Sequence, residues 1–316
     1  MLLLIVALSS SASALLNDSL KVYYQFNETS GTVIYNQVND SNHGVITGTQ
    51  VVTGIIDSAR NFSGLAKANR ILFNKSMLEI KNQSTWNVWV KSNKITEGVF
   101  IGKWGTTTNN FSILFRTEAD GRASFSMSDG SKHPQLNTTT GGLSAGTWYM
   151  FTAMQNSTHM LLYVNGKFNN SLAWAKNMQS STGTPLTVGA YTQNYAVANL
   201  HGRVDEIGVW NRSLSQAEIT QLYNNGSALS FSEFNKTTAN NSCTYSGSGQ
   251  WNINISDNCT LQTQTVPNAI RVFGTNGTLT INGTVLANKT ILMEPSTYTG
   301  KFVVAIIKGY TFGVFK

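Results

Sequence analysis

The chain has 316 residues, of which 41% are hydrophobic and only 12% are charged, and its formal net charge is +7. This apolar fraction is sufficient for a core and excludes extensive disorder, whereas the charged fraction is about half that of ordinary soluble domains. The Lys and Arg residues stand singly and are not interleaved with aromatic residues, so the pattern argues against a nucleic-acid-binding protein.

The first residues are typical of an export signal. A short apolar run ends in the small residues Ala12-Ser13-Ala14, which fit a signal-peptide cleavage site, so we predict a signal peptide at 1–14. No Lys or Arg follows Met1, and a buried first strand is the alternative. This run and the C-terminal KFVVAIIKGYTFGVFK are both too short to span a membrane, so we expect no integral membrane protein.

Asparagine acceptor sites for glycosylation also favour export. Of 34 asparagines, 19 lie in Asn-x-Ser/Thr, whereas random placement predicts roughly 7. Turn chemistry explains some of them, because Asn is favoured in turns. We predict a secreted or cell-surface glycoprotein. Asn211 also lies in an Asn-x-Ser motif. The sites singled out are Asn27, Asn61, Asn137, Asn156, Asn235, Asn276 and Asn282.

From Leu20 to Trp210 the chain reads as short strands separated by turns. LKVYYQF alternates apolar and polar residues with period two, and later candidates are RILF, TWNVWV, GVFIGKW, NFSILFR, ASFSMS, TWYMFTAMQ, HMLLYV, LTVGAY and GRVDEIGVW. Asn165-Gly166 predicts a hairpin, because a type I′ turn needs positive φ at both central residues. Many short strands at this spacing indicate an antiparallel sandwich or barrel.

One helix is predicted, within SLSQAEITQLYNNG. Ser215 is the N-cap and Glu218 stands three residues later, which makes a capping box. Leu214 and Ile219 form a hydrophobic staple, and Asn225-Gly226 would end the helix in a left-handed conformation.

Beyond the helix, residues 228–242 are polar and aperiodic and are predicted to be a linker. Residues 243–316 are strand-like again and contain repeated Asn-Gly-Thr turns. They predict a small β domain, either β-helix-like or a sandwich. This domain is incomplete if further coils follow. Cys243 and Cys259 enclose a Ser-Gly-Ser-Gly turn, and an even cysteine count in an exported chain favours a disulfide over a metal site.

These segments together resemble the laminin G-like members of the concanavalin A-like jelly-roll superfamily. YYQFNETSGTVIYNQVNDSNHG, TGIIDSARNFSG, TWNVWV, GTWYMFTAMQ and LLYVNGK are similar to successive family segments, and GRVDEIGVWNRSLSQAEITQLYNNG is the most specific match. The resemblance implies an all-β fold, a two-sheet antiparallel jelly roll over 15–227 with one short C-terminal helix. It implies less about function, because this fold serves lectins, adhesion modules, glycosidases and spacers.

The adjacent carboxylates Asp205 and Glu206 raise the question of catalysis. A retaining glycosidase needs two carboxyls about 5–5.5 Å apart on one side of a cleft, whereas neighbours on a regular strand point to opposite faces. Glu118 and Asp120 have the required spacing but precede Gly121 at a turn tip, which predicts a solvated loop. We therefore expect a scaffold role for Asp205 and Glu206, with hydrogen bonds from backbone groups, Arg203 or Arg212, and we predict no catalytic residues. Trp210, Ser215 and Glu218 are also predicted to be structural.

Calcium is the one cofactor that the resemblance implies. The loop YNQVNDSNHG offers oxygen ligands at Asn36, Asp40 and Asn42, and Asp205 is a further candidate at the rim. Relatives often have Asp where Asn36 stands, which lowers the expected affinity. A turn stabilised by these side chains is the alternative.

Four aromatic residues in loop-like stretches are candidate sugar-stacking groups: Trp104, Trp174, Tyr191 and Tyr195. Isolated exposed aromatics are common on protein surfaces, which is the competing explanation. We predict non-catalytic recognition or adhesion, with a glycan or a neighbouring surface protein as the partner. A structural spacer of a cell-surface or virion-associated assembly is the second candidate, and a polysaccharide-active enzyme is the third.

Overall fold

The computed structural model describes residues 15–65, 69–74, 80, 83–105, 110–139, 143–181, 183–191, 198–234, 245, 250–254, 259–273, 279–287, 291–293 and 313–314. The chain divides into two compact units. The first comprises Leu16–Asn235 and is called the sandwich unit; the second contains the strands beyond residue 250 and is called the C-terminal unit. The predicted signal peptide lies outside the described residues.

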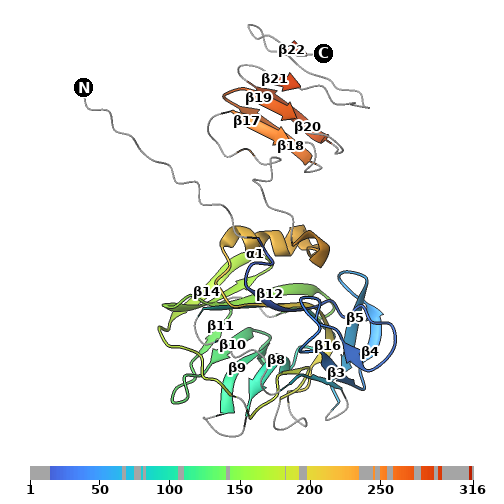
Figure 1. Cartoon of the computed structure of the whole chain (residues 1–316), viewed down its shortest axis with the longest axis vertical. Coiled ribbons are helices and arrows are strands. Elements are labelled where there is room, and N and C mark those ends of the chain that lie inside the picture. The colour runs from blue at the N-terminus through green and yellow to red at the C-terminus, as the bar shows by residue number, and fades with distance from the viewer. Residues whose placement is uncertain are drawn as a thin grey trace, which may run out of the picture. The chain divides into compact units, whose positions relative to one another are not determined.

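Two antiparallel sheets face each other in the sandwich unit (Figure 1). Sheet A has the order β14-β13-β12-β7-β16-β5-β4, and β1 also pairs with β16. Its strands are β1 (Leu20–Tyr24), β4 (Gln50–Thr53), β5 (Ser58–Ser63), β7 (Ser84–Ser92), β12 (Trp148–Gln155), β13 (His159–Val164), β14 (Lys167–Ala173) and β16 (His201–Trp210). This architecture confirms the predicted jelly-roll sandwich.

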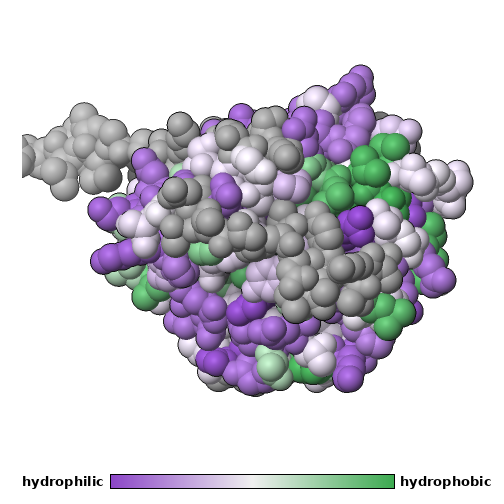
Figure 2. Space-filling view, turned by 90° about the horizontal axis from the view of Figure 1, so that it is seen from below, coloured by the Kyte–Doolittle hydropathy of each residue, from purple (hydrophilic) through white to green (hydrophobic). Residues whose placement is uncertain are grey.

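Sheet B has the order β11-β10-β9-β8-β15-β6-β3-β2. Its strands are β2 (Val33–Ile34), β3 (Gly44–Thr47), β6 (Arg70–Leu72), β8 (Gly98–Trp104), β9 (Phe111–Thr117), β10 (Ala123–Met127), β11 (Gln135–Asn137) and β15 (Thr187–Val188). Viewed from the side of sheet B, hydrophilic residues predominate among those coloured, and hydrophobic residues gather in small groups, the largest toward one edge (Figure 2).

The main core fills the space between the sheets. Val22, Tyr24 and Phe26 all point into it, as their period-two spacing predicts. Tyr23, on the opposite face of the same strand, is only 1% exposed. A second layer covers this outer face of sheet A, so both faces of the sheet are buried.

The helix α1 (Gln216–Tyr223) contributes Ile219 and Leu222 to that outer layer. Ser215 and Glu218 make the predicted capping box, and Leu214 and Ile219 are both buried. The helix ends one residue earlier than predicted, because the left-handed residue at its C-cap is Asn224. The Tyr223 ring stacks on Trp89 with centroids 5.7 Å apart and fixes the helix to β7.

The predicted linker at 228–242 is wrong for residues 228–234, which pack on the sandwich unit. After the short helical turn η2 (Asn224–Gly226), the chain packs back on the outer face of sheet A through η3 (Phe231–Glu233). Phe234 is fully buried and lies edge-on to Tyr23 at 4.8 Å. The polar composition of 228–242 concealed these apolar contacts, so the sandwich unit extends beyond the predicted boundary at residue 227.

The C-terminal unit is built from parallel strands. They are β17 (Trp251–Asn254), β18 (Cys259–Val266), β19 (Ile270–Phe273), β20 (Leu279–Ala287), β21 (Ile291–Met293) and β22 (Gly313–Val314). Alternate strands pair: β17 pairs with β19, β19 with β21, and β18 with β20.

Of the two predicted alternatives, a β-helix and a sandwich, the register of these strands favours the β-helix. Trp251 pairs with Ile270 and Ile270 with Ile291, while Cys259 pairs with Leu279 in the other sheet. Each coil therefore takes about 20 residues and gives one strand to each sheet, which is the geometry of a parallel β-helix. Cys243 lies outside the described residues, so the disulfide with Cys259 stays a prediction. In the described part of the chain, no helix combines the length and apolarity of a membrane span.

Candidate functional site

Asp205 and Glu206 lie where β16 changes partner. The first half of β16 pairs with β5 up to Val204, and the second half pairs with β1 from Ile207 onward. A bulge interrupts the pairing with β7 at this point, and Glu206 has a left-handed φ of 48°. Such a bulge reorients side chains on the strand that carries it.

The bulge overturns the expectation that the two carboxylates point to opposite faces. Val204 and Ile207 both belong to the core between the sheets, although they are three residues apart instead of two. The two acids between them therefore share the outer side of sheet A, where Asp205 contacts the 54–57 turn and Glu206 contacts Tyr23. The prediction assumed a regular strand, whereas this segment contains a bulge.

Both carboxylates are fully buried and hydrogen-bonded within the scaffold. Asp205 Oδ2 accepts bonds from the backbone N–H groups of Ile55 at 2.8 Å and Ile56 at 3.3 Å. Glu206 Oε2 accepts a short hydrogen bond from the Tyr23 hydroxyl. Burial raises the pKa of Asp205 to about 9, with a further contribution from Glu206, and raises the pKa of Glu206 to about 8. The acids thus tie β1, β16 and the 54–57 turn together.

The two predicted arginines bind other groups. Arg203 Nη1 donates to the Thr53 carbonyl at 3.1 Å, and Arg212 forms an ion pair with Glu218, with its Nη1 3.0 Å from Oε2. Asp205 accepts the predicted backbone hydrogen bonds, whereas Arg212 binds Glu218 of the helix cap. The strand-to-helix corner is therefore held by Arg212 and Glu218.

The proposed calcium ligands do not fit a common cation site. Asn36 Oδ1 accepts bonds from the N–H groups of Tyr23 at 3.0 Å and Val38 at 3.2 Å, and its amide nitrogen donates to Asn39 and Ser41. Its carboxamide is thus engaged within the turn, which is the alternative that the sequence left open. Asp40 is exposed, the Asn42 amide donates to Ser41, and Asp205 binds the 54–57 turn.

The aromatic candidates do not converge on one site. Trp104 is partly exposed at the end of β8 and stacks on Phe111 with centroids 4.4 Å apart, and exposed His133 lies edge-on to both rings. We call Trp104, Phe111 and His133 the aromatic cluster. Trp174 follows β14 and packs against the main core, and its Nε1 is buried without a hydrogen-bond partner. Tyr195 lies outside the described residues.

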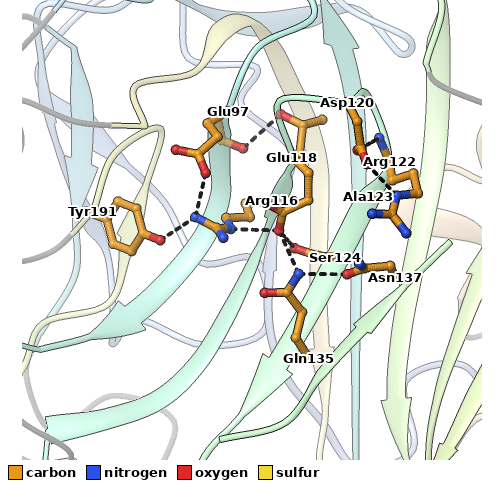
Figure 3. A network of polar contacts seen from close by, with 12 residues as sticks. Glu97, Arg116, Glu118, Asp120, Arg122, Ala123, Ser124, Gln135, Asn137 and Tyr191 are labelled. Atoms are coloured by element: carbon orange, nitrogen blue, oxygen red, sulfur yellow. Dashed lines mark hydrogen bonds and ion pairs between the residues drawn. The ribbon is translucent and has the colours of Figure 1, made fainter.

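Tyr191 belongs to a charged network on sheet B (Figure 3). Arg116 Nη1 donates to the Tyr191 hydroxyl at 2.6 Å and pairs with Glu97 at 3.3 Å, while its Nε contacts Glu118 at 3.0 Å. Ser124 and Gln135 also donate to Glu118. The prediction of a solvated loop is therefore wrong for Glu118, which is mostly buried in this network, and right for exposed Asp120.

An amide-lined cleft of about 510 Å³ opens at one end of the sandwich. The strand register places its residues there, because β12 ends at Gln155 opposite Ser84, and Thr85 pairs with Trp210 at the end of β16. The residues that line it are Gln83, Gln155, Ser157, Asn177 and Asn211. We call this pocket the amide cleft.

The chemistry of the amide cleft is uncharged and polar. Its described lining offers carboxamide donors and acceptors with one hydroxyl, and Gln83 Nε2 already donates to Ser157 Oγ at 2.9 Å. Trp174 adjoins it, since the Trp174 N–H donates to the Thr158 carbonyl at 2.8 Å and Gln155 Nε2 donates to Lys176. Carboxamides and a hydroxyl match a ligand that presents hydroxyl groups.

Sequence reasoning identified Trp174 but missed the amides around it. In a chain with 34 asparagines, no individual Asn or Gln stands out, and these residues come from segments far apart in the sequence. The predicted acceptors Asn27, Asn61, Asn137 and Asn156 lie in the sandwich unit. Asn282 lies on β20, whereas Asn235 and Asn276 fall outside the described residues. Their glycosylation stays a prediction.

Comparison with solved structures shows the same fold in several binding domains. The binding domain of Paraclostridial Mosquitocidal Protein 1 superposes with a TM-score of 0.55 and 15% identity, over 67% of this chain and 53% of that chain. The binding domain of botulinum neurotoxin DC, in complex with rat synaptotagmin II, superposes with a TM-score of 0.52 and 14% identity, over 66% of this chain and 52% of that chain. The chain thus covers about half of these toxin domains.

A third similar structure is domain 4 of AbnA, an extracellular arabinanase of family GH43 from Geobacillus stearothermophilus, in complex with arabinotriose. It superposes with a TM-score of 0.51 and 17% identity, over 64% of this chain and 97% of that domain. Curated protein sequences include no match. A laminin G family model, described as the concanavalin A-like lectin/glucanases superfamily, matches residues 65–220. The sandwich unit of this chain therefore belongs to the concanavalin A-like lectin/glucanase superfamily.

Proposed function

We propose that the sandwich unit is a non-catalytic recognition domain that binds a glycan in the amide cleft. The observation that carries this proposal is the cleft itself, a hollow of about 510 Å³ whose described lining is carboxamide and hydroxyl. Each carboxamide can donate and accept hydrogen bonds, as vicinal sugar hydroxyls require, and the described lining holds no charged side chain that a neutral sugar would leave unpaired.

The similar structures support this assignment without identifying the ligand. One is in complex with arabinotriose and another with the protein synaptotagmin II, so the fold serves both kinds of partner. The uncharged cleft favours the glycan. Secretion or display at a cell surface is part of the proposal, supported by the acceptor sites and the apolar N-terminal run.

A recognition role also accounts for the acidic residues better than catalysis does. Asp205 and Glu206 have no exposed surface, and Asp205 Oδ2 and Glu206 Oε2 accept hydrogen bonds from the 54–57 turn and from Tyr23 of the same domain. A glycosidase acid and its partner must reach the scissile bond. Measurable hydrolysis of a polysaccharide by the purified protein would contradict the non-catalytic assignment.

The test is a glycan-array screen of the full-length chain with calcium and again with chelator. We expect specific binding that persists in chelator, because Asn36 and Asp205, two of the predicted calcium ligands, are engaged in other hydrogen bonds. Asn177→Ala should weaken binding about tenfold through loss of one or two hydrogen bonds. Gln50→Ala, which removes an exposed amide on β4, is the matched control and should bind normally.

The other outcomes separate the alternatives. Absence of binding to any glycan would contradict the proposal and favour a protein-binding or spacer module. Binding that disappears in chelator would restore the calcium prediction at Asn36, Asp40 and Asn42. Equal losses in Asn177→Ala and Gln50→Ala would place the binding site away from the amide cleft.

A further inference from the structure

One chain segment connects the amide cleft with the aromatic cluster. Residues 174–181 run across the sandwich, and Asn177 lines the cleft near their start. Further along, the Gln179 N–H donates to the Ser128 carbonyl at 2.7 Å, just beyond β10, and Ser112 Oγ on β9 donates to the Gln179 carbonyl at 2.8 Å. The segment thus passes from the end of sheet A onto sheet B.

The far end of this segment lies beside the aromatic cluster. Ser181 Oγ donates to the carbonyl of Asn110 at 3.0 Å, and Asn110 immediately precedes Phe111, which stacks on Trp104. Four Cα–Cα steps separate Asn177 from Ser181, so their Cα atoms are at most about 15 Å apart. The segment therefore links a residue of the cleft to a residue beside the cluster over a short distance.

The two features offer complementary contacts. The cleft presents hydrogen-bonding groups without charge, whereas the cluster presents partly exposed Trp104 and Phe111 with an exposed imidazole at their edge. Aromatic rings bind apolar faces and leave a polar rim free for water. A chain of sugar rings has both hydroxyl-rich edges and apolar faces, repeated from one unit to the next.

We propose that the ligand is a neutral glycan chain of several sugar units that occupies both features. One unit binds in the amide cleft by hydrogen bonds, and a later unit lies on the aromatic cluster. The inference rests on the proposed function and specifies its ligand as an oligosaccharide or polysaccharide, in place of a single terminal sugar. The aromatic cluster is then a second subsite that increases affinity only for longer chains.

The test measures affinity as a function of chain length. Arabino-, xylo- and cello-oligosaccharides of one to six units are titrated into the full-length protein by calorimetry. We expect affinity to rise with length in at least one series and then to level off. In Trp104→Leu, which keeps apolar packing on Phe111, the longest binder should weaken about fivefold and the shortest less than twofold.

Two further variants make the result interpretable. Asn177→Ala should weaken short and long oligosaccharides alike, and Phe168→Ala, which removes an exposed aromatic ring on β14, should weaken neither. Thermal melting of each variant confirms folding, and His133→Ala replaces Trp104→Leu if that variant melts early. Its expected pattern is the same, with the larger loss for longer chains.

Failure of this inference is distinguishable from failure of the proposed function. Affinity that is independent of length, or a Trp104→Leu loss that is equal for short and long chains, would overturn the two-subsite arrangement and leave the cleft proposal intact. Absence of binding at every length, in every series and on the array, would overturn both.

Discussion

The buried acid pair shows how one residue conformation decides what a motif does. Asp205 and Glu206 are adjacent in a strand-forming stretch, and alternation would put one of them on each face. The left-handed φ of 48° at Glu206 places both on the outer side of sheet A. There they satisfy backbone N–H groups and a phenol at the junction of three segments, at the cost of burying two titratable groups.

This pair predicts that the protein becomes less stable as the pH rises. Both pKa values are raised by burial, to about 9 and about 8, so the folded protein binds more protons than the unfolded chain between roughly pH 4 and those values. The stabilisation is complete below the unfolded pKa values and is lost as the pH approaches the folded ones. We expect a lower Tm at pH 9 than at pH 5.

Glu206→Gln tests the origin of this dependence. The amide keeps an acceptor for the Tyr23 hydroxyl but does not titrate, so its Tm should change less between pH 5 and pH 9. Asp40→Asn, at an exposed carboxylate, is the control and should keep the dependence of the natural protein. A Glu206→Gln protein that retains the full pH dependence would assign the effect to other groups.

At the scale of elements, the cap of α1 was the most predictable feature. Ser215, Glu218, Leu214 and Ile219 are close in sequence, and their contacts follow from helix geometry alone. The same holds for the Asn165-Gly166 turn, where both residues have the positive φ that a type I′ hairpin requires. Local interactions of this kind are encoded within a few residues.

The tertiary structure adds Arg212 to this cap, and that contact has a measurable consequence. Ser215→Ala should lower the free energy of unfolding by about 1 kcal/mol. Glu218→Ala should cost about 2 kcal/mol, because it removes both the reciprocal cap and the ion pair with Arg212. Urea denaturation of the two variants measures both values.

Glu218→Gln separates the two contributions of this side chain. It keeps a capping acceptor for the Ser215 N–H but loses the charge that pairs with Arg212. Its stability should lie between those of the natural protein and Glu218→Ala. A loss as large as that of Glu218→Ala would mean that the ion pair accounts for the whole effect.

At the scale of the whole molecule, the outer layer on sheet A determines where the sandwich unit ends. Phe234 lies seven residues beyond the boundary expected from composition, yet it is completely buried against Tyr23 and Trp210. Phe234→Ala should therefore destabilise the domain by about 3–5 kcal/mol.

The matched control for this prediction is Phe168→Ala, since Phe168 is 53% exposed. It should change the free energy of unfolding by no more than about 0.5 kcal/mol. Similar losses in the two variants, measured by urea denaturation, would show that the 228–234 segment does not contribute to the core.

Much of the fold was predictable, whereas the candidate site largely was not. The central strands were found because each alternates or carries β-branched and aromatic residues, and the resemblance then ordered them into a jelly roll. The short strands β2, β4 and β11 have two to four residues, too few for a period to show. The sequence contained no signal for the amide cleft, because its four carboxamides come from four separate places in an asparagine-rich chain.

The sequence by itself determined the all-β class, the jelly-roll sandwich, the capped helix and the strand-rich C-terminal unit. The class, the helix and the strand-rich unit depend on periodicity, turn residues and caps, which are local, whereas the jelly roll was implied by the family resemblance. Only the tertiary structure decided that Asp205 and Glu206 share a face, that residues 228–234 belong to the domain, and that scattered amides meet in a cleft beside Trp174. Those features depend on strand register and on contacts between distant segments, and neither is set by the residues on either side.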